Sequence, residues 1–203
     1  MHDTEPPYEF IGFVFLTAFV CFVVELLLGD GSLPLVEVKS EEVGPLVFVY
    51  KRNVGPYHKV GSVFDEVSTM VQNLGISCDR LVGIYFDDPR RVDPIKLRSE
   101  IGVVVGTSLQ NYTSLQDSVT KAGLEIKFLP KLRGCGASFS YCATFYVFVS
   151  GCQVYKSLKR ALSGKWEKQP CIKMHSLAQK TVLFFVPYKH YRFLKPFDLC
   201  TVS

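Results

Sequence analysis

The order of predicted elements constrains the fold of this chain more than any other feature. One strand-like run, an amphipathic helix and two more strand-like runs follow one another twice. In the first unit, strand-like runs lie at 46–51, 81–86 and 100–105. Apolar residues from Val60 to Leu74 keep helical spacing between the first two runs. The first unit is therefore predicted to be βαββ, with its helix ending at the glycine that follows Leu74.

The second unit has the same predicted order. A strand-like run at 143–149 precedes a helical stripe from Val154 to Leu162, and "CIKMH" (171–175) and "TVLFFVPY" (181–188) supply two closing strands. Neither unit can bury its sheet and its helix alone. We therefore expect an α+β fold, one domain over residues 43–188, with the ligand site in a concave seam between the two halves.

The stretch between the two units is harder to interpret. Residues 112–122 have a helical pattern and "LEIKFLP" (124–130) has a strand pattern, whereas the Gly, Cys and Ser-rich "GCGASFS" (134–140) is typical of a loop. A helix, a strand and a loop are expected here in that order.

The composition limits the chemistry of the chain. Nearly half of the residues, 48%, are hydrophobic, which is enough for a core. The seven cysteines include no CxxC pair, and the four histidines are scattered. This pattern argues against a disulfide framework and a zinc site, and we expect a reducing compartment, no metal and no cofactor.

Residues 10–28 are apolar except for Thr17 and Glu25, and their number matches that needed for a bilayer-spanning helix. A cleaved signal peptide is the alternative, but the start "MHDTEPPYE" is acidic where such a peptide would be basic. We expect a retained transmembrane helix at 10–28, followed by a linker at 29–42.

The flanking charges predict the orientation of that helix. Residues 1–9 contain no Lys or Arg, whereas Lys39, Lys51 and Arg52 follow the helix. The positive-inside rule then places residues 1–9 in a lumen and the rest of the chain in the cytosol. The sequon "NYT" at Asn111 should consequently stay unmodified, because glycosylation takes place on the lumenal side.

Beyond the apolar segment the chain is basic. Residues 1–28 contain four of the 19 acidic residues and none of the 23 basic ones, so the remainder carries 23 basic against 15 acidic residues. Such an excess suits an anionic membrane surface or nucleic acid, and it is also common in ordinary basic domains. Since no nucleic-acid-binding motif is present, we expect no nucleic-acid partner.

Two stretches together carry a family resemblance. "YKRNVGPYHKVGSVFDEV" and "YFDDPRRVDPIKLRSEIGV" place G-P-Y before an amphipathic helix, then an aromatic strand, D-x-P and a Leu-Arg turn. This arrangement resembles the GyrI-like (DNA gyrase inhibitor-like, SOUL-related) domain. With a single N-terminal span, it is similar to members of that group that act in the endoplasmic-reticulum membrane as receptors for selective autophagy. The resemblance implies that such a receptor binds the bilayer, autophagy modifiers, an AAA+ segregase and a small molecule in the cleft.

The resemblance also suggests which residues line the site. Gly55 and Pro56 make the strand-to-helix turn, and Tyr57 stands at the helix entrance, either facing the seam or filling the core edge. The ligand-cleft candidates are four tyrosines from different segments and two basic residues that share one predicted strand. They are Tyr50, Tyr57, Tyr85, Tyr146, Lys173 and His175.

A departure from the family predicts the charge of the ligand. GyrI-like domains commonly carry Glu-x-Tyr on the penultimate strand, where this chain has Lys173 and His175. Residues two apart share a strand face, so a cleft that receives both would prefer anions. The alternative to a cleft-facing position is that Lys173 is exposed on the protein surface.

The last part, 189–203, is predicted to be a basic tail. "YRFL" (191–194) has the spacing of an autophagy-modifier motif, but its neighbours are basic where acidic residues would be expected. The end "CTVS" makes Cys200 a prenylation candidate.

Three classes of function remain. The first is an adaptor or receptor anchored in the endoplasmic-reticulum membrane, and the second is a GyrI-like small-molecule binder or a hydrolase of small electrophiles. A nucleic-acid binder is the third. Because no set of nucleophile, base and orienting acid is recognisable, we expect a protein that is not an enzyme.

Overall fold

The computed structural model divides the chain into two compact units, Met1–Leu35 and Val36–Ser203. Nearly all residues that it describes belong to the second unit, and they are Phe19, 37–78, 80–140, 154, 157–162, 170–189, 191 and 194–197. The predicted transmembrane helix at 10–28, except for Phe19, and the predicted strand at 143–149 lie outside this set. Within the described part of the chain, no helix is both long enough and apolar enough to cross a membrane.

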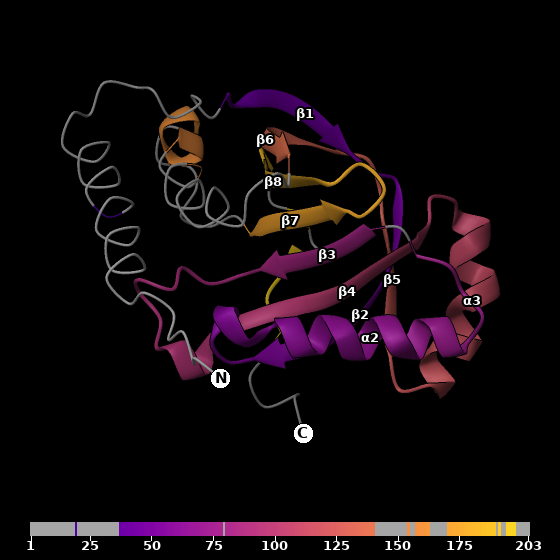
Figure 1. Cartoon of the computed structure of the whole chain (residues 1–203). Coiled ribbons are helices and arrows are strands. Elements are labelled where there is room, and N and C mark those ends of the chain that lie inside the picture. Colours follow the sequence, from indigo (N-terminus) through magenta and orange to yellow (C-terminus); the bar gives the residue numbers. More distant parts are fainter. Residues whose placement is uncertain are drawn as a thin grey trace, which may run out of the picture. The chain divides into compact units, whose positions relative to one another are not determined.

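The described residues of the second unit form one antiparallel sheet of eight strands (Figure 1). Their order in the sheet is β1-β6-β8-β7-β3-β4-β2-β5. The strands span β1 Lys39–Val43, β2 Leu46–Val54, β3 Arg80–Tyr85, β4 Arg98–Gly106, β5 Glu125–Leu129, β6 Leu132–Ser140, β7 Cys171–Ser176 and β8 Thr181–Pro187.

The strand order contains the same arrangement twice. In the first half, β2 leads through α2 (Gly61–Asn73) to β3 and β4, and the three strands lie in the order β3-β4-β2. In the second half, β6 leads through the helical residues 157–161 to β7 and β8, which lie in the order β7-β8-β6. The two halves join where β3 pairs with β7. The α+β class is therefore confirmed, and each half has the order β-α-β-β.

The segment expected to be a loop at 134–140 is instead part of β6, so that prediction is wrong. Its glycines allow neighbouring strands to come close. A Cβ on Gly134 would lie 2.2 Å from the Val186 carbonyl oxygen of β8. On its other side β6 pairs with β1, which forms within the stretch expected to be linker. Glycine here indicates close packing in the sheet, and not a turn.

The sheet curls into a half-barrel because the chain joins strands from its two ends. Only Gly44 and Pro45 separate β1 from β2, yet β1 lies at one edge of the strand order and β2 next to the other edge. Gly44 has a positive φ of 97° and lies against Pro130, where a side chain would collide with the backbone. The buried apolar residues on the inner face form one cluster, namely Val43, Leu46, Phe48, Tyr50, Val82, Ile84, Val104, Leu129, Leu132, Ile172, Met174, Phe185 and Leu194.

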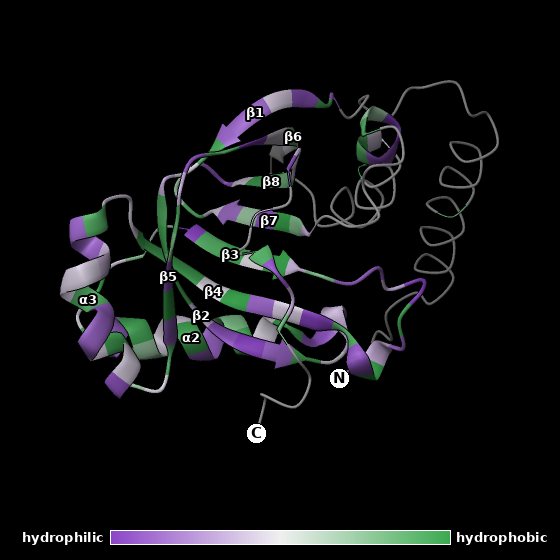
Figure 2. Cartoon of the chain, turned by 180° about the vertical axis from the view of Figure 1, so that it is seen from behind, coloured by the Kyte–Doolittle hydropathy of each residue, from purple (hydrophilic) through white to green (hydrophobic). Residues whose placement is uncertain are grey.

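The helices pack on the other face of the sheet. Val67 and Val71 of α2 and Val119 of α3 (Leu109–Lys121) are fully buried against strands of the first half. Leu158 of the second half packs against β6 and β8. Both α2 and α3 carry hydrophilic and hydrophobic residues, as amphipathic helices on a sheet should (Figure 2).

The ends of α2 and α3 follow from local sequence. Gly75 has a φ of 71°, and the Ile76 N–H bonds the Val71 carbonyl in a left-handed cap. The prediction that α2 ends at this glycine is confirmed. At α3, Ser108 and Asn111 form a capping box, so the helix begins at Leu109, earlier than the predicted residue 112.

The close approach at β6 gives a stability prediction. Gly134→Ala should lower the free energy of unfolding by about 1–3 kcal/mol, because its methyl group would collide with the backbone of β8. Gly61→Ala is the matched control, since no atom lies within 4 Å of its added Cβ, and its stability should stay equal or rise slightly. Urea unfolding of the fragment 36–203 measures both. Equal stability of the two variants, or a fragment without a cooperative transition, would contradict this description of the fold.

Candidate functional site

The helix-bearing side of the paired strands β3 and β7 forms a surface that we call the central face. It consists of Leu81, Gly83 and Tyr85 from β3 and Cys171, Lys173 and His175 from β7. The register pairs Tyr85 with Cys171, Gly83 with Lys173 and Leu81 with His175. Since side chains alternate along a strand, these six residues point to the side on which the helices pack. The two halves of the fold meet at this surface.

Lys173 lies in the middle of the central face. It pairs with Gly83 on one side and with Phe184 of β8 on the other. Its ammonium nitrogen lies 5.2 Å from the centre of the Phe184 ring, and the side chain is half-buried. Burial lowers the pKa of Lys173. Among the described residues, no carboxylate pairs with this ammonium group.

The Tyr85 ring folds back over Gly83. A Cβ on that glycine would lie 2.8 Å from the Tyr85 hydroxyl oxygen, so only glycine leaves room for the ring. Tyr57, from the short helix η1 (Tyr57–Lys59), meets Tyr85 edge to face with ring centres 4.8 Å apart. Burial raises the pKa of both phenols, which are therefore neutral at pH 7. The two predicted site residues Tyr57 and Tyr85 are thus brought together.

His175 is the second basic residue of β7 on this face. Its ring lies 6.5 Å from that of Phe64 on α2, at an angle of 65°. Burial, and secondly the charge of Lys173, lower the pKa of His175 to about 4. The imidazole is therefore neutral at pH 7, and Lys173 supplies the positive charge of the pair.

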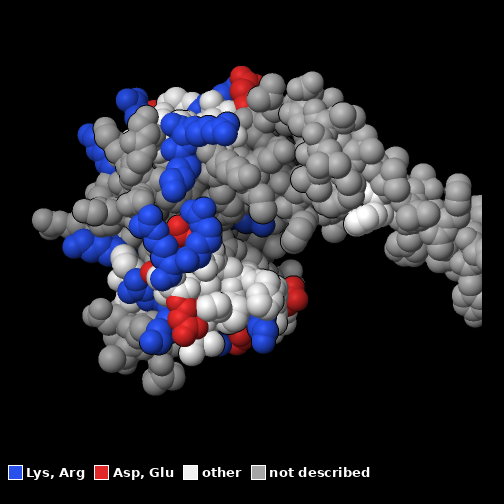
Figure 3. Space-filling view, turned by 90° about the vertical axis from the view of Figure 1, so that its left-hand side faces the viewer, with Lys and Arg blue, Asp and Glu red and all other residues white. Residues whose placement is uncertain are grey.

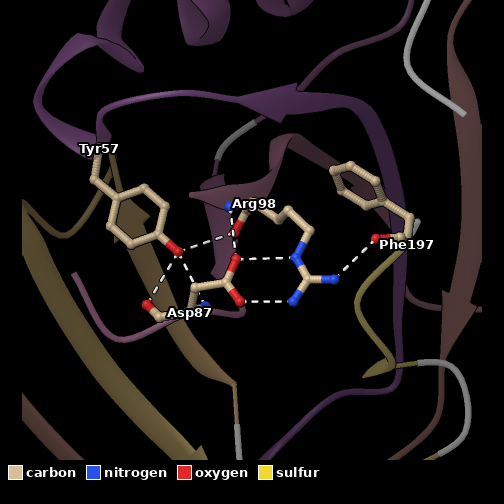
Figure 4. A network of polar contacts seen from close by, with 4 residues as sticks. All are labelled: Tyr57, Asp87, Arg98 and Phe197. Atoms are coloured by element: carbon tan, nitrogen blue, oxygen red, sulfur yellow. Dashed lines mark hydrogen bonds and ion pairs between the residues drawn. The ribbon is translucent and has the colours of Figure 1, made fainter. Parts of the chain in front are cut away.

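A polar network fixes Tyr57 (Figure 4). The Tyr57 hydroxyl lies 3.1 Å from the Asp87 carbonyl and 3.0 Å from the Arg98 carbonyl, and it accepts the Asp87 N–H at 3.1 Å. The Asp87 carboxylate accepts two hydrogen bonds from Arg98, one from Nε at 3.0 Å and one from a terminal guanidinium nitrogen at 2.7 Å. Arg98 also donates to the Phe197 carbonyl at 3.1 Å, which ties the segment near the C-terminus to β4.

The sequence did not reveal the roles of Asp87 and Arg98. Both belong to the D-x-P and Leu-Arg stretches that carried the family resemblance, but their pairing depends on the return of the chain from β3 to β4. In the sequence, the signal for this pairing was an acidic residue, Asp87, at the start of the connection and a basic residue, Arg98, at its end.

Tyr50 lies away from the other predicted site residues. It points to the inner face, stacks on Phe48 with ring centres 5.1 Å apart and donates a hydrogen bond to Glu125 at 3.1 Å. Tyr50 and Tyr57 are therefore not brought together, because strand parity sends the Tyr50 side chain to the opposite side of the sheet. Tyr146 and Cys200 lie outside the described residues.

The inner face also holds an ion pair that the sequence did not predict. Glu100 of β4 is 4% exposed and bonds the ammonium of Lys127 from β5, which lies 4.6 Å from the Tyr50 ring centre. Burial raises the pKa of Glu100 and lowers that of Lys127. Their mutual attraction opposes both shifts. With this partner, Glu100 is not a free acid facing the inner cluster.

The charges on the outside are mainly basic where the connection from β3 to β4 lies. Figure 3 shows Lys and Arg side chains gathered on this side, with a few acidic side chains among them. Arg90, Arg91 and Lys96 of this connection are exposed, and Arg90 pairs with Asp88 at 2.9 Å. No group of three or more potential metal ligands occurs among the described residues.

Comparison with known proteins supports a GyrI-like fold. No family model matches the chain. A DNA gyrase inhibitor of Pectobacterium carotovorum subsp. carotovorum (strain PC1) is 34% identical over 53 residues, which are 26% of this chain and 34% of that protein. The matched part thus spans about a third of that relative.

Solved structures agree with this assignment of the fold. EcmrR in a complex with DNA has a TM-score of 0.52 at 10% identity, and the match covers 89% of this chain and 68% of EcmrR. SAV2435 bound to tetraphenylphosphonium has a TM-score of 0.50 at 8% identity, with 78% and 99% covered. At these identities the likeness concerns the fold alone. The chain therefore has a mixed α+β, GyrI-like fold with a curled antiparallel sheet.

The two central tyrosines should respond differently to loss of the hydroxyl. Tyr57→Phe should lower the free energy of unfolding by about 1–3 kcal/mol, because the part-buried Asp87 N–H and Arg98 carbonyl lose their shared partner. Tyr85→Phe is the control and should cost less than about 1 kcal/mol, since its hydroxyl makes no hydrogen bond within the described part of the chain. Thermal and urea unfolding measure both variants. A larger loss for Tyr85→Phe would show that the network of Figure 4 does not hold Tyr57 as described.

Proposed function

We propose that this protein is a binding protein whose GyrI-like domain receives a small molecule, or a side chain of a partner protein, on the central face. The observation that carries the proposal is the half-buried Lys173 among aromatic rings at the junction of the two halves. A half-buried cation beside the Phe184 ring is costly for a core but useful for recognition. The structural neighbour SAV2435, described as bound to tetraphenylphosphonium, supports small-molecule binding as a use of this fold.

The chemistry of the central face favours binding over turnover. His175 is a weak general base because its pKa is lowered to about 4. The tyrosine hydroxyls are neutral since burial raises their pKa. We therefore propose a protein that is not an enzyme, with hydrolysis of small electrophiles as the alternative.

A screen of small aromatic compounds against the full-length chain tests this proposal. Ligand-observed NMR should detect binders, and Phe64→Ala should weaken their binding about three- to tenfold, because it removes one aromatic wall beside His175. Tyr112→Ala is the matched control, because Tyr112 lies on α3, which packs against β2, β4 and β5 in the first half. If no compound binds, or if both variants weaken binding equally, the central face is not the ligand site.

For the whole chain, we propose a receptor or adaptor held in the endoplasmic-reticulum membrane, with the second unit in the cytosol. The support is the apolar sequence 10–28 with its flanking charges, together with a resemblance to testis-expressed protein 264. On this proposal the partners are autophagy modifiers and an AAA+ segregase, and the cell process is selective autophagy of the endoplasmic reticulum. Co-purification of these partners with the full-length chain from cells is the direct test.

Asn111 reports on the orientation. In the structure its side-chain oxygen accepts from the Ser108 N–H at 3.2 Å within the capping box of α3. We expect the protein from cells to keep its mass after endoglycosidase treatment, because a cytosolic Asn111 never meets the glycosylation machinery. A chain with a glycosylation tag added before residue 1 is the control and should lose mass. The proposal would be overturned if the untagged chain lost mass on this treatment and the Asn111→Gln variant did not. That result would place the domain in the lumen.

A further inference from the structure

Lys173 is the one Lys, Arg, Asp or Glu among the described side chains on the helix-bearing side of β8, β7, β3 and β4. The side chains on that side are Ser99, Ile101 and Val103 of β4, Leu81, Gly83 and Tyr85 of β3, Cys171, Lys173 and His175 of β7, and Val182, Phe184 and Val186 of β8. Those of β4 and β8 are buried, whereas Tyr85, Lys173 and His175 are partly exposed. The two basic side chains of this set are Lys173 and His175, and the His175 imidazole is neutral at pH 7 because its pKa is lowered to about 4.

The acidic residues of α2 do not neutralise Lys173. Glu66 pairs with Lys51 at 2.8 Å, and Asp65 is exposed. Among the described residues, Lys173 therefore presents an uncompensated positive charge on an apolar and aromatic surface. An anionic group that reached it would recover interaction energy lost by partial burial.

The surroundings of Lys173 also select for a flat apolar body. On one side lies the Phe184 ring, with its centre 5.2 Å from the ammonium nitrogen. On the other side the Tyr85 ring covers Gly83, the cross-strand partner of Lys173. Phe64 adds a third ring across His175. Phe184 is buried, whereas Tyr85 and Phe64 are partly exposed, and partly exposed aromatic rings favour stacked or edge-to-face contacts with another ring.

We propose that the central face binds a planar aromatic ligand with one negative charge, whose anionic group pairs with the Lys173 ammonium. This inference rests on the proposed ligand-binding function, and it adds the chemical class of the ligand. The site opposes lipophilic cations, because their charge would approach Lys173, with which no carboxylate of the described residues pairs. Tetraphenylphosphonium, named for SAV2435, belongs to that disfavoured class here.

Three isosteric probes test the sign of the charge: 2-naphthoate, 2-naphthamide and 2-naphthylmethylammonium. Equilibrium dialysis at pH 7 with the full-length chain, in a non-ionic detergent and against detergent blanks, measures their binding. We expect 2-naphthoate to bind about tenfold or more tightly than the ammonium probe, with the amide between them, as a charge-assisted hydrogen bond requires. Equal binding of the three probes, or preference for the ammonium probe, would overturn the anionic class while leaving ligand binding intact. If none of them binds, the proposed function fails together with this inference.

Variants of Lys173 locate the effect. Lys173→Met keeps the aliphatic stem and should abolish the preference for naphthoate over naphthamide, whereas Lys173→Arg should keep it. The matched control is Lys121→Met, an exposed lysine in the last turn of α3, which should leave all three affinities unchanged. Circular dichroism confirms folding of each variant. Preference for naphthoate that survives in a folded Lys173→Met protein would show that another group binds the anion.

Discussion

The antiparallel pairing of β3 with β7 is the constraint on which the rest of this structure depends. Each half has three strands in an order that leaves β3 or β7 at its inner edge, and six residue pairs join these edges. The junction turns two incomplete βαββ units into one continuous sheet. Without it, the inner faces of the halves could not share a core, and the central face would not exist.

The curl of the joined sheet gives its two faces different chemistry. On the inner face the strands bury large apolar side chains and the ion pair of Glu100 with Lys127. Buried charges of this kind require each other, because removal of either one leaves the other uncompensated. On the helix-bearing face the comparable cation, Lys173, has an aromatic neighbour in place of a carboxylate. This is the charge for which we propose an external partner.

The network around Tyr57 links that surface to distant parts of the chain. Asp87 and Arg98 close the connection from β3 to β4, and Arg98 also holds the Phe197 carbonyl. Arg52 of β2 contacts the same Phe197 through its ring, 5.4 Å from the ring centre. Rigid support of this kind sets the position of an aromatic wall, which a binding site needs if the ligand is to be recognised by shape.

The sequence by itself determined the elements whose signal is local. Alternation and helical spacing predicted β2, β3, β4, α2, β7 and β8, and a single glycine predicted the end of α2. The spacing of two between Lys173 and His175 predicted that they share a face of the strand. The Gly-Pro turn predicted that Tyr57 lies at the entrance of the helix. These features depend on periods and turn chemistry that a short window of residues contains.

The tertiary structure decided what depends on distant partners. Gly134 and Gly136 suggested a loop, but both belong to strand β6, and at Gly134 the close approach of the β8 backbone requires glycine. Tyr50 faces the interior since its parity in β2 was fixed by pairing with β4 and β5, and not by its own sequence. Likewise, the neighbours of Lys173 became known only from the strand register, which places it between Gly83 and Phe184. A side chain's type and spacing are written in the sequence, whereas its neighbours across a sheet arise from long-range pairing that no local pattern encodes.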